Sequence, residues 1–298
     1  MNKNVAIVVT YNRKELLIKN IEALLNQNEK DFDILIIDNA SNDGTFEKIE
    51  KYLENIRVKY VNTGKNLGGA GGFEYGLSVA LEEKYDKFWL MDDDTIPEKT
   101  AYEELKKADK VLNEEYGFLS SVVLWKDNSY CLMNRQKLKK PWYQKAEYLK
   151  ESLLPTYYAT FVSFFLTRKT IEVNGFPIKE FFIWGDDVEY STRIAKKSDC
   201  YIVLKSIVNH ETVVNKGSSI EKDLKERIPR YFYAYRNEMY IAKRDGIRGI
   251  IYQLLKLFYH LLKILFLGNE FKLKKIFILL KGTIQGIFFN PKVKHLKK

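Results

Sequence analysis

The sequence predicts an α/β protein with a mostly parallel central sheet, followed by a basic helical tail. Apolar, β-branched runs alternate with stretches of helical spacing, and polar clusters follow the ends of the runs. This alternation is typical of βαβ units, which build parallel sheets through right-handed crossovers. The charge is divided unevenly, because residues 246–298 hold eleven Lys or Arg and one acid, whereas residues 1–245 hold 38 of each sign. We therefore expect a neutral globular body and a strongly basic tail.

The expected elements follow in chain order. Four apolar runs predict buried parallel strands: residues 5–10, 32–37, 58–61 and 88–91. Helical spacing predicts helices at residues 16–25 and 46–53, and the glycines of residues 64–76 predict a loop. In the second half, the sequence predicts a buried strand at residues 158–167 and a turn at 174–175. It also predicts the start of a helix at 186–187 and a last strand at 201–209.

Cysteine usage and the N-terminus suggest a cellular compartment. Cys131 and Cys200 do not form a disulfide framework of the secreted type, so a reducing cytoplasm is expected. Residues 5–9 are too short for a secretory core and have no small-residue cleavage site after them. We expect a protein that works on the cytoplasmic side of the membrane.

Three adjacent carboxylates follow the fourth predicted strand: Asp92, Asp93 and Asp94. Adjacent anions repel one another, and a divalent cation such as Mg²⁺ or Mn²⁺ is the simplest reason to hold them together. On an extended backbone Asp92 and Asp94 share a face, whereas Asp93 points away. The alternative is a solvated acidic turn.

Other polar groups follow strand ends, at residues 10–13, at Asp38 and in the glycine-rich segment. Ligands of parallel sheets bind beyond the carboxyl ends of the strands, so these groups are expected to converge on one site. The glycines would let backbone approach a ligand, and a tight turn packed on the sheet is the alternative. His210, at the end of the last predicted strand, is either a metal ligand or a structural histidine.

A second acidic pair, Asp186 and Asp187, follows an apolar run that ends at Trp184. A general base must lie near the nucleophile but away from the metal, and one of these carboxylates suits that role. Capping of a helix N-terminus is the alternative.

The tail is apolar over residues 250–267, apart from a narrow polar stripe: Gln253, Lys256, His260 and Lys263. Residues 276–289 show a similar pattern. Lysines inside a bilayer are costly, so we expect these helices to lie on an anionic membrane surface. Packing on the body or in a homo-oligomer is the alternative, and nucleic acid is not expected as a partner.

Together these motifs resemble the inverting family 2 glycosyltransferases, over about residues 4–245. The resemblance rests on residues 8–13 (VVTYNR), 38–45 (DNASNDGT), 66–73 (NLGGAGGF), 92–94 (DDD), 184–190 (WGDDVEY) with Arg193, and 236–237 (RN). It implies one nucleotide-sugar domain of the GT-A type at residues 1–245 and a membrane-associating tail at residues 246–298.

The resemblance also implies roles for matched residues. The nucleotide would be held by Thr10, Asn12, Arg13 and Asp38, and the rest of the donor would face Asn66, Gly68, Gly69, Gly72 and Asp92. A divalent metal (Mn or Mg) would be bound by Asp92, Asp94 and His210. Asp187 would be the catalytic base, and the acceptor would be held by Asp186, Trp184 and Arg236.

The full Asp triplet resembles bacterial galactofuranosyltransferases, whereas the glycine-rich motif is shared with rhamnosyltransferases. Many family members have Glu-Asp-x-Asp where this chain has Asp-Asp-Val-Glu at 186–189. The implied function is metal-dependent, inverting transfer of galactofuranose from UDP-galactofuranose to a lipid-linked saccharide in bacterial polysaccharide synthesis. Rhamnose transfer from dTDP-rhamnose and a non-catalytic nucleotide-sugar-binding subunit are the alternatives.

Overall fold

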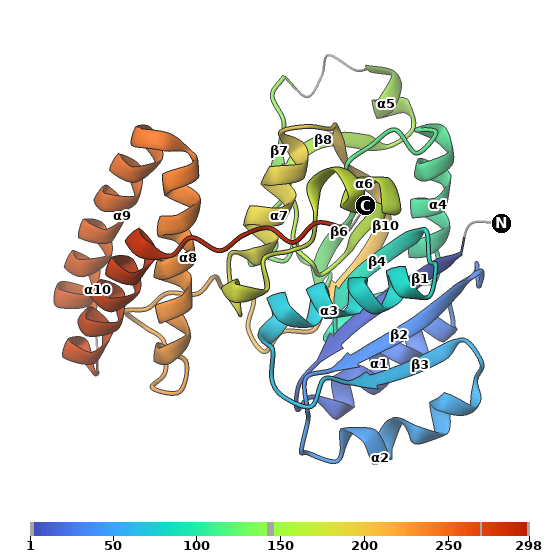
Figure 1. Ribbon diagram of the computed structural model, residues 1–298, viewed down its shortest axis with the longest axis horizontal. Coiled ribbons are helices and arrows are strands. Elements are labelled where there is room, and N and C mark those ends of the chain that lie inside the picture. The colour runs from blue at the N-terminus through green and yellow to red at the C-terminus, as the bar shows by residue number, and fades with distance from the viewer. Residues whose placement is uncertain (1–2, 142–145, 269, 297–298) are drawn as a thin grey trace.

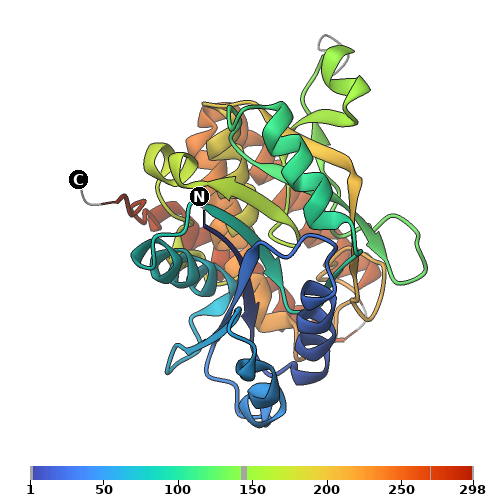
Figure 2. The same ribbon diagram turned by 90° about the vertical axis from the view of Figure 1, so that its right-hand side faces the viewer.

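The computed structural model describes residues 3–141, 146–268 and 270–296. Figure 1 shows a larger α/β body beside a separate unit of α8, α9 and α10, and the view of Figure 2 places this helical unit behind the body. The chain passes from the body into the helical unit and then returns, so that its last described residues lie against the body (Figure 1).

The strands are β1 (Asn4–Thr10), β2 (Phe32–Asp38), β3 (Val58–Asn62), β4 (Lys87–Asp92), β5 (Thr95–Pro97), β6 (Leu119–Trp125), β7 (Lys137–Leu138), β8 (Leu153–Tyr158), β9 (Phe164–Thr167) and β10 (Cys200–His210). The α-helices are α1 (Lys14–Leu25), α2 (Thr45–Ile49), α3 (Gly68–Glu82), α4 (Ala101–Val111), α5 (Ala146–Lys150), α6 (Arg168–Asn174), α7 (Asp186–Ala195), α8 (Tyr231–Arg244), α9 (Gly246–Leu267) and α10 (Lys272–Phe288). Short 3₁₀ turns are η1 (Glu50–Glu54), η3 (Lys179–Phe181) and η4 (Ile228–Arg230).

The strands form one ten-stranded sheet in the order β3-β2-β1-β4-β9-β6-β10-β8-β7, with β5 paired to β10. β3, β2, β1 and β4 are parallel, as predicted, and β6 and β10 are also parallel. β9 runs antiparallel between β4 and β6. The parallel half carries the carboxyl ends of β1, β2 and β4 to one edge, which is where the candidate site lies.

Both faces of the sheet are covered by helices. Buried side chains of α1 and α4 pack on one face, around Trp89 and Tyr102. Residues of α3, α6 and α7 pack on the other face, around Phe73 and Tyr190. Because both faces of the sheet are buried, the sequences of its strands are nearly continuous apolar runs.

Two predicted elements are wrong. The predicted loop at 64–76 ends at Leu67, and the glycines from Gly68 onward lie in helix α3. The single strand predicted at 158–167 is split, because β8 ends at Tyr158 and β9 begins only at Phe164.

Close packing against the sheet explains the glycines inside α3. A Cβ atom on Gly72 would lie 2.6 Å from a Val9 methyl carbon, and one on Gly76 would lie 2.6 Å from Ile7. Glycine is a poor helix former, but here it lets the helix approach β1. Tertiary packing thus overrides the local preference of the sequence.

The described residues attach the helical unit to the body along α8 and again beyond α10. At its start, the Asn237 side-chain amide donates to the carbonyls of Phe181 and Trp184. At its end, the chain beyond α10 returns to the body, where the Phe176 N–H donates to the Lys294 carbonyl at 2.9 Å. The Lys294 ammonium pairs with Glu74 on α3.

Candidate active site

Asp92, Asp94 and His210 form a cluster of three possible metal ligands. Asp92 ends β4, Asp94 lies in the turn between β4 and β5, and His210 ends β10. One ligand atom from each residue lies within 4.8 Å of the others. Two carboxylates and an imidazole suit a hard or borderline divalent cation, so these residues fit the predicted metal.

Asp93 is not part of this cluster, and the backbone there is a turn and not an extended strand. Its carboxylate accepts a hydrogen bond from the Thr10 hydroxyl at 2.8 Å and one from Arg13 at 3.2 Å. Arg13 also pairs with Asp94 at 2.7 Å. Thr10 and Arg13 therefore hold the acidic turn against the end of β1.

The carboxylates of the acidic turn affect one another's ionisation. Burial, with the neighbouring Asp94, raises the pKa of Asp92 to about 6. Burial opposes ionisation of Asp94 as well, but hydrogen bonding from His210 and the charge of Arg13 hold its pKa below the ordinary value. A divalent cation would relieve the mutual repulsion of the carboxylates.

His210 is held from both sides. Its Nε2 lies 3.0 Å from Asp94 Oδ1, and its Nδ1 lies 2.7 Å from Asn134 Oδ1. Burial disfavours the cation, but the Asp94 hydrogen bond raises the pKa of His210 to about 10. The imidazole is thus fixed in orientation, with Nε2 directed at the acidic cluster.

Asp186 and Asp187 begin helix α7, as predicted, after Gly185 at φ 86°. Asp187 Oδ1 accepts a hydrogen bond from the Val188 N–H at 2.7 Å. Burial raises the pKa of Asp187 to about 7, with a further contribution from the charge of Asp92. Burial and the charge of Asp187 raise the pKa of Asp186 well above its ordinary value, and Asp92 contributes here too. The two acidic motifs, far apart in sequence, are therefore near enough for their charges to interact.

Asp38 and Asn12 shape the loops beside the acidic turn. Asp38 is buried and accepts hydrogen bonds from the Ser41 N–H at 2.8 Å and the Tyr60 hydroxyl at 2.6 Å. Asn12 has φ 52°, and its side-chain oxygen accepts from the Asn42 N–H at 2.8 Å. Contact of either residue with a nucleotide stays a prediction.

The glycine-rich motif has two kinds of position. A Cβ on Gly68 would clash with the Phe182 carbonyl oxygen at 2.1 Å, and Gly72 packs on β1, whereas a Cβ on Gly69 would meet nothing within 4 Å. Asn66 accepts a hydrogen bond from the Gly68 N–H at 2.8 Å and so shapes the turn before α3. Of these glycines, Gly69 has the free space that approach to a ligand requires.

The predicted acceptor residues lie at the junction with the helical unit. Trp184 has φ 63° and packs edge-on against Tyr231, with ring centroids 5.0 Å apart. Arg236 donates to the carbonyls of Glu180 and Phe181, and its guanidinium lies 4.0 Å from the centroid of the Phe289 ring. These contacts tie α8 to the segment before α7, and an acceptor role for Arg236 stays a prediction.

Sequence reasoning missed three residues near the site. Asn134 lies in an irregular segment with no recognisable motif. Tyr158 is the last residue of β8. Burial raises its pKa, and the nearby charges of Asp187 and Asp186 raise it further. Arg230 lies in η4. Burial lowers its pKa, and the nearby charges of Arg227 and Arg13 lower it further. Only the Arg-Ile-Pro-Arg pattern at 227–230 offered a sequence signal, as a concentration of positive charge.

Carboxylates at the carboxyl edge of such a sheet, with a second acidic pair nearby, are typical of glycosyltransferases with the GT-A fold. Residues 5–167 match glycosyl transferase family 2, and the chain belongs to this family. The predicted family and enzyme class are therefore confirmed.

Two relatives show the range of sugars handled by similar chains. Galactofuranosyltransferase GlfT1 of Mycolicibacterium smegmatis is 25% identical over 262 residues, which cover 83% of this chain and 85% of the relative. Poly(ribitol-phosphate) beta-N-acetylglucosaminyltransferase TarP of Staphylococcus aureus is 28% identical over 251 residues, covering 81% of this chain and 72% of TarP.

Solved structures support the fold. GalNAc-T7, crystallised with UDP, GalNAc and Mn²⁺, aligns with a TM-score of 0.60 at 12% identity, over 82% of this chain and 48% of that one. TarS of S. aureus aligns with a TM-score of 0.54 at 14% identity, over 96% of this chain and 44% of TarS. The chain spans less than half of either structure, and both confirm the predicted GT-A-like sheet.

Proposed function

We propose that this enzyme transfers galactofuranose from UDP-galactofuranose to a lipid-linked saccharide, with inversion at the anomeric carbon. The reaction would serve polysaccharide synthesis at the cytoplasmic face of a bacterial membrane. The observation that carries the proposal is the cluster of Asp92, Asp94 and His210, with Asp187 near enough for the charge of Asp92 to raise its pKa. Similarity to GlfT1 over more than four fifths of both chains supports the choice of sugar.

The proposed reaction is a single displacement. Asp187 takes the proton of an acceptor hydroxyl while that oxygen forms a bond to the anomeric carbon of the donor. The bond between this carbon and the diphosphate breaks at the same time, and UDP leaves with the electron pair. Attack from the side opposite the leaving group gives inversion, by the geometry that also applies to inverting glycosidases.

Asp92, Asp94 and His210 would hold a divalent metal, which when bound offsets negative charge on the leaving diphosphate. Arg13 lies beside the same carboxylates and, with Arg230, adds positive charge at this edge. Asp186, deeper and harder to ionise than Asp187, suits a hydrogen bond to the acceptor in its protonated form.

The test is a panel of nucleotide sugars with Mn²⁺, with release of free nucleotide measured in the presence and absence of a lipid-linked acceptor. We expect turnover with UDP-galactofuranose that is lost in EDTA and restored by Mn²⁺ or Mg²⁺. Turnover only with dTDP-rhamnose would replace the proposed sugar with the rhamnose alternative. Donor binding with no release of nucleotide from any donor would favour a non-catalytic subunit.

A further inference from the structure

Helix α9 is an amphipathic helix whose polar side faces the protein. Its interior polar side chains all contact α8 or the chain that precedes it: Gln253, Lys256, His260 and Lys263. Gln253 and Lys256 bond the carboxylate of Glu238, and His260 lies 2.9 Å from the Tyr235 hydroxyl. Lys263 pairs with Glu221 at 2.7 Å. The polar stripe is thus satisfied inside the molecule.

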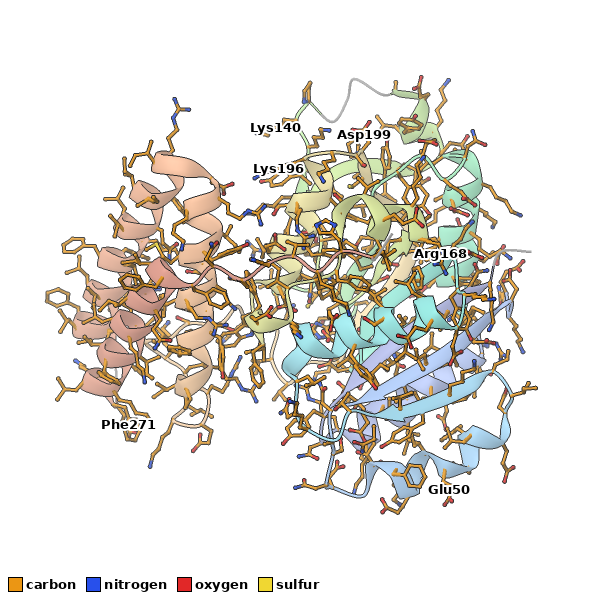
Figure 3. The ribbon with its side chains drawn as sticks, viewed as in Figure 1. Glu50, Lys140, Arg168, Lys196, Asp199 and Phe271 are labelled. Carbon is orange, nitrogen blue, oxygen red and sulfur yellow. The ribbon has the colours of Figure 1, made fainter. Side chains whose placement is uncertain are left out.

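The outward side of the same helix is apolar and open to solvent. Its side chains are 49% to 79% exposed: Ile251, Tyr252, Leu254, Leu255, Phe258, Tyr259, Leu265, Phe266 and Leu267. Helix α10 adds residues that are 45% to 84% exposed: Leu273, Phe277, Leu280, Ile284, Ile287 and Phe288. Figure 3 shows side chains projecting outward along both helices, down to Phe271 at their junction. Apolar surface of this extent on a soluble protein marks an interaction site.

The charges argue for anionic lipid as the partner. Exposed cations lie on the same helices, Arg248 on α9 and Lys274 and Lys281 on α10, and Lys292 follows α10. Two copies of the chain that met through this surface would bring these exposed cations together. The cations would repel one another, whereas an anionic leaflet would attract them.

The ion pairs also decide how the helix meets the bilayer. Residues Gly246–Leu267 are long and apolar enough to span a membrane, by length and composition alone. A spanning α9 would have to break its contacts with α8, or carry Glu238 and Glu221 with it into the hydrocarbon. Buried carboxylates and lysines separated from their partners are strongly unfavourable. An orientation parallel to the surface keeps every one of these pairs intact.

We propose that the outward sides of α9 and α10 form one membrane-docking surface, which lies flat in the headgroup region of an anionic bilayer while the polar stripe of α9 remains on α8. The membrane location rests on the proposed function, and the docking surface is the addition. Because vesicle binding needs no donor or acceptor sugar, it can fail or succeed independently of the proposed reaction.

The test is flotation of the full-length protein with vesicles of phosphatidylcholine, with or without 30% phosphatidylglycerol. We expect binding to the anionic vesicles that survives moderate salt, since the apolar contacts are not screened. Leu255→Glu and, separately, Phe258→Glu should reduce the bound fraction at least tenfold. Ile56→Glu is the matched control, because Ile56 is 92% exposed and lies on the body. This variant should bind vesicles as well as the unaltered protein does.

Three results would overturn the proposal. The first is wild-type protein that stays unbound at low salt with the anionic vesicles. The second is equal binding by Phe258→Glu, Leu255→Glu and wild type. The third is a stable dimer in sedimentation without lipid, lost in Phe258→Glu, which would assign this surface to a second copy of the chain. Nucleotide release with a soluble acceptor should be unchanged in Phe258→Glu, which separates docking from catalysis.

A second, independent inference concerns Asn134. Its side-chain oxygen lies 2.7 Å from His210 Nδ1, and its amide nitrogen donates to the Thr160 hydroxyl at 2.8 Å. The Cys131 thiol lies 3.0 Å from the same oxygen, as a donor. These partners fix which end of the amide faces the imidazole. An acceptor at Nδ1 keeps a proton on that nitrogen, so Nε2, beside Asp94, is the ring nitrogen that would bind a metal.

We infer that Asn134 is a positioning residue that selects the metal-binding tautomer of His210. The test is Mn²⁺ affinity measured by EPR, with the His210 tautomer followed by ¹⁵N NMR in the Zn²⁺-free and Mg²⁺-bound protein. Asn134→Ala should weaken Mn²⁺ binding at least tenfold and mix the tautomers, and Asn134→Asp, which keeps an acceptor, should restore the tautomer. Gln136→Ala, which alters the same segment through Ser120 and Ser121, should change neither. Unchanged Mn²⁺ affinity in Asn134→Ala would overturn the inference.

Discussion

Asp187→Asn is expected to stabilise the protein while it removes transfer activity. The carboxylate of Asp187 is difficult to ionise where it is, since burial raises its pKa from 3.8 to about 7. When the pKa of a group is higher in the folded state than in the unfolded state, its contribution to stability is fully present below the pKa of the unfolded state. This contribution is lost as the pH rises through the pKa of the folded state. The ionised carboxylate therefore destabilises the protein at pH 8 but not at pH 4.

The size of the effect follows from the two pKa values. The difference between 3.8 and about 7 corresponds to an upper limit of about 4 kcal/mol, at 1.36 kcal/mol per pH unit. Asp187 is only partly buried by its solvent-accessible surface, so we expect about 1–3 kcal/mol once solvent screening is allowed for. Asparagine keeps an oxygen for the Val188 N–H, so the substitution does not remove that contact.

The assay is urea unfolding at pH 8 and at pH 4.5, in EDTA, beside a measurement of transfer. Asp187→Asn should be more stable than wild type at pH 8, with the difference shrinking toward pH 4.5. Transfer should fall by about 10²–10⁴, the usual contribution of a general base, and donor affinity should change only a few-fold. Asp245→Asn, at an exposed surface pair with Lys196, is the control and should shift stability by less than about 1 kcal/mol at either pH. Equal stability of Asp187→Asn and wild type at pH 8 would refute the electrostatic reasoning, and near-normal transfer would refute the assignment of the base.

Three further outcomes are expected. Gly72→Ala should destabilise the protein by about 1–3 kcal/mol in thermal unfolding, because the new Cβ would lie 2.6 Å from Val9. Gly69→Ala should be neutral or stabilising in the same assay, because its Cβ meets nothing within 4 Å. If the backbone at Gly69 approaches the diphosphate, this variant should also raise the KM for the donor. Asp92→Ala should weaken Mn²⁺ and UDP binding together by calorimetry, and UDP affinity that is indifferent to both EDTA and this substitution would contradict a metal role. Arg230→Ala should weaken UDP binding about tenfold and flatten its salt dependence, and an unchanged dissociation constant would show that this guanidinium does not face the diphosphate.

The sequence predicted the parallel half of the sheet and the convergence of the strand ends, because both follow from local periodicity and a general rule of parallel topology. The family resemblance predicted that Asp92, Asp94 and His210 share one site, although 118 positions separate the first from the last. The helical state of the glycine motif could not be predicted, since glycine disfavours helices and the compensating contact with β1 is tertiary. Asn134 carries no pattern at all, because its role depends on where an irregular segment folds over His210.

The orientation of α9 shows a different limit of sequence reasoning. Periodicity predicted the narrow polar stripe correctly, but it does not say which side faces solvent. The partners that turn the stripe inward, Glu238 and Glu221, lie in other elements. Only the packing of α9 against α8 distinguishes an outward apolar side from an inward one.

The attachments at the two ends of the helical unit fix its position against the body. One runs through Asn237 to the carbonyls before α7, and the other through Lys294 to Phe176 and Glu74. A domain held at both ends cannot swivel about a single hinge. With α9 and α10 on a bilayer, Asp187 would lie at a constant height above the lipid. This height would select acceptors by the length of their saccharide. Acceptor hydroxyls at one distance from the lipid anchor would reach the base, and saccharides grown beyond that length would pass out of its reach.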